Sequence, residues 1–166
     1  MSTDAPLIVV ADSSAVVSLA VIERLDILTA LFDDVAIPLA VWQELGEVAQ
    51  LKHLSILKTF FKDKVKVLQQ ANYLFPFVDY GESEAILLYK EIQATYLIID
   101  DKHAREVAEE LGITCIGTLG ILYRAKEKGL IRELRPLFLQ LLKHERYYAK
   151  PLLNHLLKKA NEALML

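Results

Sequence analysis

Short apolar runs alternate with longer amphipathic stretches along most of the chain. Several of the runs, such as Leu7–Ala11, are almost continuously apolar, which is typical of strands covered on both faces in a parallel sheet. Enrichment in β-branched and aromatic residues predicts five strands, at Leu7–Ala11, Val35–Pro38, Lys64–Val67, Tyr96–Ile99 and Ile113–Ile116.

The stretches between these runs carry apolar residues at helical spacing. We expect one helix over Ala15–Ala30 and two over Leu39–Phe61, with a break near Gly46. Gly112 and Gly129 would each close a helix, because glycine adopts the left-handed turn that often follows one. Three further helices are expected, at Glu82–Gln93, His103–Leu111 and Thr118–Lys128. Alternation of strand and helix predicts an α/β fold with right-handed crossovers.

Beyond Leu130 the strand pattern stops. Two apolar helical stripes follow, at Leu134–Leu142 and Leu152–Leu164. They are unusually apolar for surface helices, which favours binding to a partner protein or to a second copy in a homodimer. The length of 166 residues fits one core, so we expect residues 1–145 to form the domain and 146–166 to extend it with helices.

Composition excludes several classes of protein. Apolar residues make up 54% and charged residues 25%, which excludes a disordered chain. No apolar run approaches the roughly 20 residues that cross a bilayer, and Met1–Asp4 lacks the basic start of a secretory signal. The single cysteine, Cys115, excludes an intramolecular disulfide framework and a cysteine-based zinc site. We therefore expect a cytoplasmic protein without a membrane segment.

The formal net charge of −3 is unevenly distributed. Residues 1–122 contain 9 basic and 18 acidic side chains, whereas residues 123–166 contain 10 basic and 4 acidic ones. The basic side chains of the second part either cover solvated helix faces or form a basic rim beside an acidic pocket, where they would hold a phosphate backbone. These side chains are Arg124, Lys126, Lys128, Arg132 and Arg135.

Acidic residues follow the strands where sites form in open α/β sheets, beyond their carboxyl ends. Asp12 follows the first expected strand and would serve, taken alone, as a helix N-cap. Asp100 and Asp101 follow the fourth strand. One of the two can cap the next helix, and the other then has no structural explanation, because adjacent like charges repel one another without a cation.

Three glutamates complete the set. Glu82 lies three residues after Asp79, at the spacing of a capping box, so capping and chemistry remain alternative interpretations. Glu84 lies off that helix face and is expected to be solvated or to support a ligand. Glu44 lies one turn into the helix after the second strand.

Together these acids predict a metal site. In a parallel sheet their positions converge on one edge, where clustered carboxylates would have raised pKa values unless a divalent cation bound them. Oxygen ligands without a Cys/His cluster favour Mg²⁺ or Mn²⁺ over zinc. The nearby Lys102 and Arg105 would either contact phosphate or be ordinary surface charges. A receiver-like phosphoryl acceptor is disfavoured, because only Asp12 follows the first strand and no lysine follows the last.

Several motifs, taken in order, carry a resemblance to a known family. They are strand-Asp-Ser-Ser, Val-Trp-Gln-Glu-Leu, Gly-Glu-Ser-Glu-Ala-Ile, Ile-Asp-Asp-Lys-His-Ala-Arg and Gly-Thr-Leu-Gly-Ile-Leu. From about Leu7 to Leu142 the chain resembles PIN domains, and is similar to the toxins of VapBC-type toxin–antitoxin pairs. The resemblance implies a three-layer α/β/α sandwich with a central parallel sheet of about five strands. It also implies a metal-dependent endoribonuclease that prefers single-stranded RNA, with a small antitoxin protein as partner.

The resemblance also implies roles for individual residues. The first two acids of the family fall on Asp12 and Glu44. The third falls on Glu82, with Glu84 as the alternative, and the fourth falls on Asp101, with Asp100 as the alternative. The expected ligands of Mg²⁺ or Mn²⁺ are therefore Asp12, Glu44, Glu82 and Asp101. Either Ser13 or Ser14 would lie beside the metal, and both serines, like Lys102 and Arg105, are candidates for contacting the substrate.

One alternative of another class remains. The same chain could be a catalytically inactive PIN-like interaction module, in which the acids only cap helices and the apolar C-terminal helices bind a partner.

Overall fold

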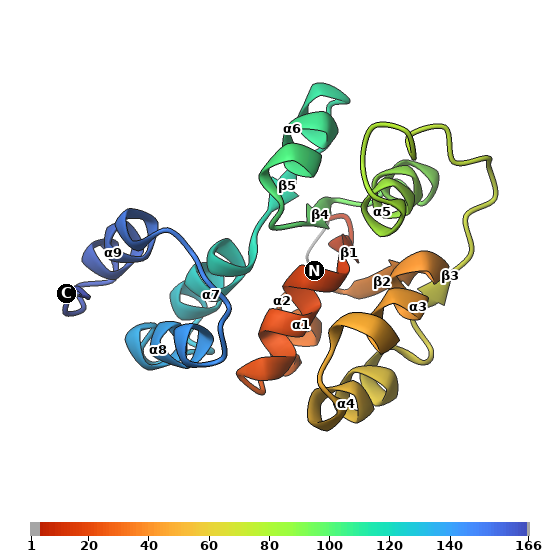
Figure 1. The fold of residues 1–166 in the computed structure, drawn as a ribbon. Helices are drawn as coiled ribbons and strands as arrows, with labels where there is room; N and C mark the ends of the chain where they lie inside the picture. The colour runs from red at the N-terminus through yellow and green to blue at the C-terminus, as the bar shows by residue number, and fades with distance from the viewer. Residues whose placement is uncertain (1–3, 166) are drawn as a thin grey trace.

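The computed structural model describes residues 4–165, and residues 1–3 and 166 of the expected domain and extension lie outside it. The described chain forms a five-stranded, all-parallel sheet in the order β3-β2-β1-β4-β5 (Figure 1). Each predicted strand is confirmed to within two residues at either end. The strands are β1 (Ile8–Ala11), β2 (Asp34–Pro38), β3 (Val65–Lys66), β4 (Tyr96–Ile98) and β5 (Cys115–Ile116).

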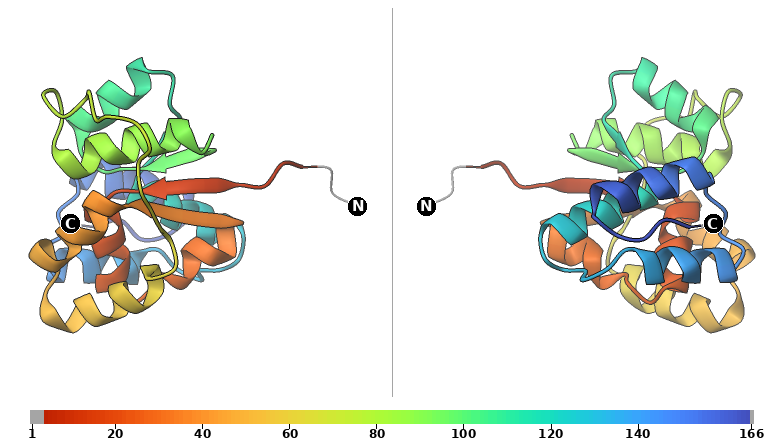
Figure 2. Two further views of the ribbon diagram at one scale, coloured as in Figure 1. Left: turned by 90° about the vertical axis from the view of Figure 1, so that its right-hand side faces the viewer. Right: turned by 90° about the vertical axis from the view of Figure 1, so that its left-hand side faces the viewer.

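Helices cover both faces of the sheet (Figures 1 and 2). Alternate strand residues face opposite cores, so Val9 and Ala11 pack in one cluster while Val10 packs in the other. One face is covered by α5 (Tyr80–Glu91) and α6 (Lys102–Glu110). The expected α/β/α sandwich is confirmed. The helices on the other face are α1 (Ser13–Val21), α2 (Asp26–Leu31), α3 (Leu39–Val48), α4 (Leu51–Phe61), α7 (Thr118–Glu127), α8 (Arg135–Lys143) and α9 (Lys150–Lys159).

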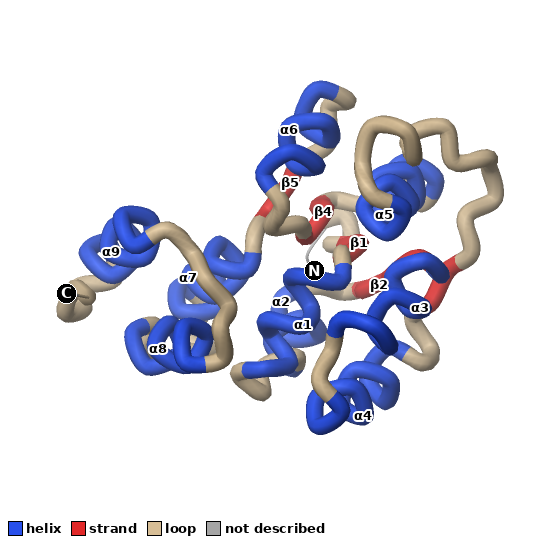
Figure 3. Tube along the Cα trace, in the orientation of Figure 1, coloured by secondary structure: helices blue, strands red, loops and turns tan. Residues whose placement is uncertain are grey.

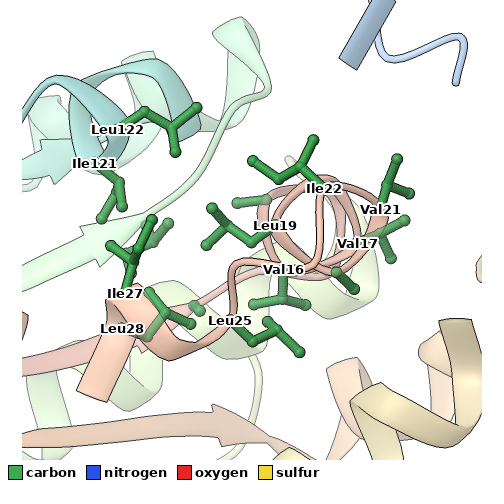
Figure 4. Close-up of a cluster of buried hydrophobic side chains, with 14 of the residues drawn as sticks. Val16, Val17, Leu19, Val21, Ile22, Leu25, Ile27, Leu28, Ile121 and Leu122 are labelled. Carbon is green, nitrogen blue, oxygen red and sulfur yellow. The ribbon is translucent and has the colours of Figure 1, made fainter. Parts of the chain in front are cut away.

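The single helix expected over Ala15–Ala30 is wrong, because α1 and α2 are separate. Glu23 takes a positive φ of 57°, and the backbone N–H of Arg24 donates to the carbonyl of Leu19 at 2.9 Å, as at a helix end. The turn keeps Leu25 in the core, where side chains of α1, α2 and α7 meet (Figure 4). Burial of apolar side chains from the turn offsets the cost of left-handed backbone at a glutamate.

The two helices expected over Leu39–Phe61 are confirmed, but the break is not near Gly46. Gly46 lies within α3, and the chain becomes extended at Ala49 and Gln50. A glycine costs a helix only about 1 kcal/mol, and the fully buried Leu45 holds this turn against the core. By contrast, Gly112 and Gly129 end their helices with φ values of 80° and 77°, as predicted.

The C-terminal apolar stripes are used mainly within the chain itself. Phe138 and Leu141 of α8 and Leu157 of α9 are fully buried in the same cluster as α1. The helical stripe expected to reach Leu164 ends with α9 at Lys159. Figure 3 shows α8 and α9 beside α7, at the end of the sheet order that carries β5. No helix within the described residues has both the length and the apolarity to cross a bilayer.

Candidate active site

The predicted acids gather beyond the carboxyl ends of β1, β2 and β4. The backbone N–H of Asp12 donates to the carbonyl of Ile98 at 2.9 Å, which extends the β1–β4 pairing by one residue and brings the ends of the two strands side by side. Parallel strands end at one edge of the sheet, and the helices that follow them begin there. We call Asp12, Glu44, Glu82, Asp100 and Asp101 the acidic edge.

Asp12 is the buried centre of the acidic edge. It occupies the N-cap position of α1 but makes no side-chain capping bond, so capping does not explain it. The side chain is 2% exposed, and its Oδ1 atom finds no hydrogen-bond partner among the described residues. Burial raises the pKa of Asp12 to about 7, and the charges of Glu44, Asp100 and Asp101 add to this, although the Ser13 backbone N–H acts in the opposite direction.

Glu44 reaches the acidic edge from α3. The hydroxyl of Ser13 donates to its Oε2 atom at 3.1 Å, which places Ser13 as a support for this carboxylate. A Cβ atom at Gly81 would collide with the same oxygen, so the start of α5 approaches Glu44 closely only because residue 81 is glycine. Sequence reasoning did not single out Gly81, although it stands inside the Gly-Glu-Ser-Glu motif.

The structure separates the two glutamates of α5. Glu82 is half-buried, and burial raises its pKa to about 8, with additional repulsion from Asp12 and Asp101. Glu84 is 8% exposed and accepts a hydrogen bond from the backbone N–H of Ala40 at 3.1 Å, in the first turn of α3. The expectation of a solvated Glu84 is therefore wrong. Glu82 therefore lies with the other carboxylates of the acidic edge, whereas Glu84 accepts a hydrogen bond from an N–H group in the first turn of a neighbouring helix, which has no partner within that helix.

The adjacent aspartates also have different partners. Asp101 caps α6, with its Oδ2 atom accepting from the backbone N–H of Ala104 at 2.9 Å. Asp100 accepts bonds from Thr118 at the start of α7, from the backbone N–H at 2.8 Å and from the hydroxyl at 2.7 Å. It accepts a third bond from the hydroxyl of Tyr148 at 2.8 Å. Each aspartate thus has a structural partner, and each still repels the charge of Asp12.

The segment between α8 and α9 was missed by sequence reasoning. The Tyr148 hydroxyl lies 2.9 Å from the Ser18 hydroxyl as well as against Asp100, and burial raises the Tyr148 pKa to about 12. Arg146 donates through Nη2 to the carbonyl and hydroxyl oxygens of Ser14, at 2.8 and 2.9 Å. Ser14 is therefore engaged by the C-terminal segment. No local pattern could have indicated contacts between residues more than a hundred positions apart.

Of the five basic residues expected to form a rim, Arg124 and Lys126 are engaged away from the acidic edge. The Arg124 guanidinium lies 5.1 Å from the ring centroid of Tyr96, which starts β4 and so marks the opposite end of the sheet. Lys126 pairs with Glu162 at 2.7 Å. Closer to the acids, Lys102 is exposed and Arg105 pairs with Glu109 along α6.

The donor set fits a hard divalent cation in its chemistry. Oxygen ligands, the unpartnered Oδ1 atom of Asp12 and the raised pKa values of Asp12 and Glu82 are features that a bound cation would relieve. Within residues 4–165, however, no three Asp, Glu, His or Cys side chains are already arranged as a metal-binding group. The acidic edge therefore offers the ligands without a closed coordination shell.

Comparison with known protein families covers most of the chain. A family model described as a PIN domain matches residues 8–162, which extends 20 residues past Leu142, the end of the range that carried the resemblance. No curated protein matches the chain. PIN domains are typically nucleases and generally bind divalent metal ions. The family model covers most of the chain, and the five-stranded parallel sheet flanked by helices is consistent with the fold of that family, so the chain belongs to the PIN-domain family.

Proposed function

We propose that this protein is a metal-dependent endoribonuclease that prefers single-stranded RNA. The observation that carries the proposal is Asp12, a buried carboxylate with an unpartnered oxygen and four acidic neighbours. Burying a charge without a partner costs several kcal/mol. An aspartate that only caps a helix has no reason to be buried without a partner, whereas an aspartate that binds a divalent cation uses its negative charge directly.

In this proposal Asp12, Glu44, Glu82 and Asp101 hold Mg²⁺ or Mn²⁺. When bound, the cation lowers the pKa of a water molecule and neutralises charge on the scissile phosphate. Ser13 orients Glu44 through the 3.1 Å hydrogen bond between them. Thr118 and Tyr148 hold Asp100 and thereby the turn that carries Asp101.

The substrate must overcome the negative charge of the acidic edge. An RNA phosphate is attracted only where a cation or a basic side chain offsets the carboxylates. Lys102 is exposed beside Asp101 and would contact phosphate, as would Arg105 if it left Glu109. Ser13 and Ser14, both already bonded within the protein, would support the site rather than bind RNA.

The test compares two isosteric substitutions. Asp12→Asn removes the central carboxylate, and Asp34→Asn removes one from the exposed start of β2, at the other end of the sheet. We expect Asp12→Asn to lower the cleavage rate of single-stranded RNA in Mn²⁺ by about 100-fold or more, because a metal contributes several kcal/mol. The control should cleave normally. Equal cleavage by Asp12→Asn would reject the role of Asp12.

A calorimetric titration with Mn²⁺ separates this proposal from the catalytically inactive interaction module. We expect wild-type protein to bind Mn²⁺ and Asp12→Asn to bind it far more weakly. Absence of binding at millimolar Mn²⁺, together with absence of cleavage, would favour the inactive module instead.

We also propose that the nuclease is the toxin of a toxin–antitoxin pair, with a small antitoxin and a second copy as its partners. The resemblance to VapC-type proteins supports this role, and exposed apolar side chains on α8 and α9, including Leu139 and Leu152, would suit a partner surface. Induced expression should arrest growth with the wild type and not with Asp12→Asn, and co-expression of a small neighbouring gene should restore growth. Sedimentation of the purified protein tests the dimer, and growth unaffected by the wild type would contradict the toxin role.

A further inference from the structure

The segment between β3 and α5 presents aromatic rings to solvent directly beside the acidic edge. Three of its aromatic side chains are more than half exposed, with Phe77 at 66%, Tyr73 at 57% and Phe75 at 54%. Tyr80, at the start of α5, is 51% exposed and contacts Phe75 edge to face, with the ring centroids 5.5 Å apart. A cluster of large exposed rings in a water-soluble domain marks a binding surface. We call Tyr73, Phe75, Phe77 and Tyr80 the aromatic platform.

The segment is anchored on its inner side, so the exposure is not the result of a loose loop. Leu74 and Val78 are each 6% exposed and pack in the cluster beneath α5. The side-chain amide of Asn72 donates to the hydroxyl of Ser83 at 2.8 Å. The segment arches over α5 (Figure 1), with its buried residues alternating with the exposed rings. Folding therefore holds the rings outward.

The carbonyl of Phe77 lies 2.9 Å from Nε2 of His103, which fixes the segment to the start of α6. A pocket of about 420 Å³ lies between the platform and the acidic edge, lined by Phe75, Phe77, Glu82, Asp101 and His103 among others. The same cavity thus has an aromatic wall and a carboxylate wall, within the size range of small-molecule sites.

The two walls together select the occupant. Asp79, which lines the same pocket and is not among the expected metal ligands, can accept hydrogen bonds from N–H groups, whereas the aromatic wall accepts a planar, uncharged ring. A nucleobase is planar and neutral and carries N–H donors, so it fits both walls. Bases in a duplex are stacked on each other and are not accessible to such a wall, but unpaired bases are.

We propose that the aromatic platform stacks unpaired bases of an RNA strand and so delivers the adjoining phosphate to the acidic edge. This inference rests on the proposed nuclease function and names the surface that gives it a preference for single strands. The platform binds the bases without regard to sequence, because every base has a face that can stack.

The experiment separates stacking from general apolar contact. A Phe75→Leu/Phe77→Leu double variant keeps apolar side chains and removes the aromatic faces, and a Phe75→Trp/Phe77→Trp variant restores them. Ile56→Ala is the matched control, since Ile56 is an exposed apolar residue of α4, which packs on the opposite face of the sheet from α5. Binding of a fluorescein-labelled single-stranded RNA is measured by anisotropy in Ca²⁺, and cleavage kinetics are measured in Mn²⁺.

We expect the leucine variant to bind the single strand at least about fivefold more weakly and to raise KM by a similar factor, with kcat nearly unchanged. The tryptophan variant and Ile56→Ala should bind the single strand as the wild type does, or better. Binding of a blunt RNA duplex should not distinguish the variants. If the leucine variant binds the single strand as tightly as the wild type, the proposal is overturned. Rings that contact only a protein partner would give this result.

The result also distinguishes this inference from the proposed function. If Asp12→Asn abolishes cleavage while the leucine variant keeps the wild-type KM, the nuclease proposal stands and the platform proposal fails. If the wild type neither binds nor cleaves any RNA, both fail. Circular dichroism melting should show that each variant folds, because the substituted rings are exposed.

Discussion

Replacing Asp12 by an uncharged residue should make the metal-free protein more stable than the wild type, by an amount that increases with pH. The carboxyl is 2% exposed, and burial raises its pKa from the ordinary 3.8 to about 7. Between these two values the folded protein holds a proton that the unfolded chain has released, so the stability contributed by this group falls as the pH increases. Asparagine has the same shape and no charge, so Asp12→Asn escapes the loss.

The magnitude follows from the same two values. The difference between pKa values of 3.8 and about 7 corresponds to about 4 kcal/mol of folding free energy lost when Asp12 ionises. This value is an upper limit, because water and side chains rearrange around an ionised group. A domain of this size has only about 5–15 kcal/mol of stability in total. In EDTA, Asp12→Asn should match the wild type near pH 4 and exceed its free energy of unfolding by up to about 4 kcal/mol near pH 8.

The assay is urea unfolding in EDTA at several pH values between about 4 and 8, with a shared m-value for each protein. Asp34→Asn, at the other end of the sheet, controls for the change in net charge. Mn²⁺ should then stabilise the wild type near pH 8, by about 2.7 kcal/mol at a concentration 100 times Kd, and leave Asp12→Asn unchanged. A stability difference between Asp12→Asn and the wild type that stays constant from pH 4 to 8 would refute the reasoning.

Three further substitutions test the surroundings of the site. Gly81→Ala should lower Mn²⁺ affinity about tenfold in a calorimetric titration, since its Cβ displaces Glu44, while urea unfolding shows no loss of stability. Tyr148→Phe should lower the free energy of unfolding by about 1 kcal/mol and slow RNA cleavage, because Asp100 loses a hydrogen bond. The control, Tyr147→Phe at the adjacent exposed position, should change neither. Glu162→Gln should lower the free energy of unfolding by about 2 kcal/mol near pH 7 and not change it well below pH 4. The reason is that the hydrogen bonds to this carboxylate outweigh its burial and lower its pKa, so the folded protein favours the charged form. A Glu162→Gln cost that persists in acid would contradict that assignment.

The sequence by itself determined where most strands and helices lie and where the acids fall relative to them. These features are local, because a strand or helix reveals itself through the period of its apolar residues and its end through capping and turn residues. Asp12 and Asp100 therefore follow their strands as predicted. The break at Glu23 was not predictable in this way, because burial of neighbouring side chains, and not a glycine or proline, stabilises the turn.

Only the tertiary structure decided which carboxylates meet and what surrounds them. Glu82 and Glu84 are two residues apart and have the same side chain, yet one faces Asp12 and Asp101 and the other accepts a hydrogen bond from the start of α3, because neighbouring helices pack against different sides of α5. The bond from Tyr148 to Asp100 joins residues 48 positions apart, and the placement of Phe75 beside Glu82 depends on how its segment is anchored across α5. Such contacts come from the packing of whole elements, and no periodicity along the chain encodes that packing.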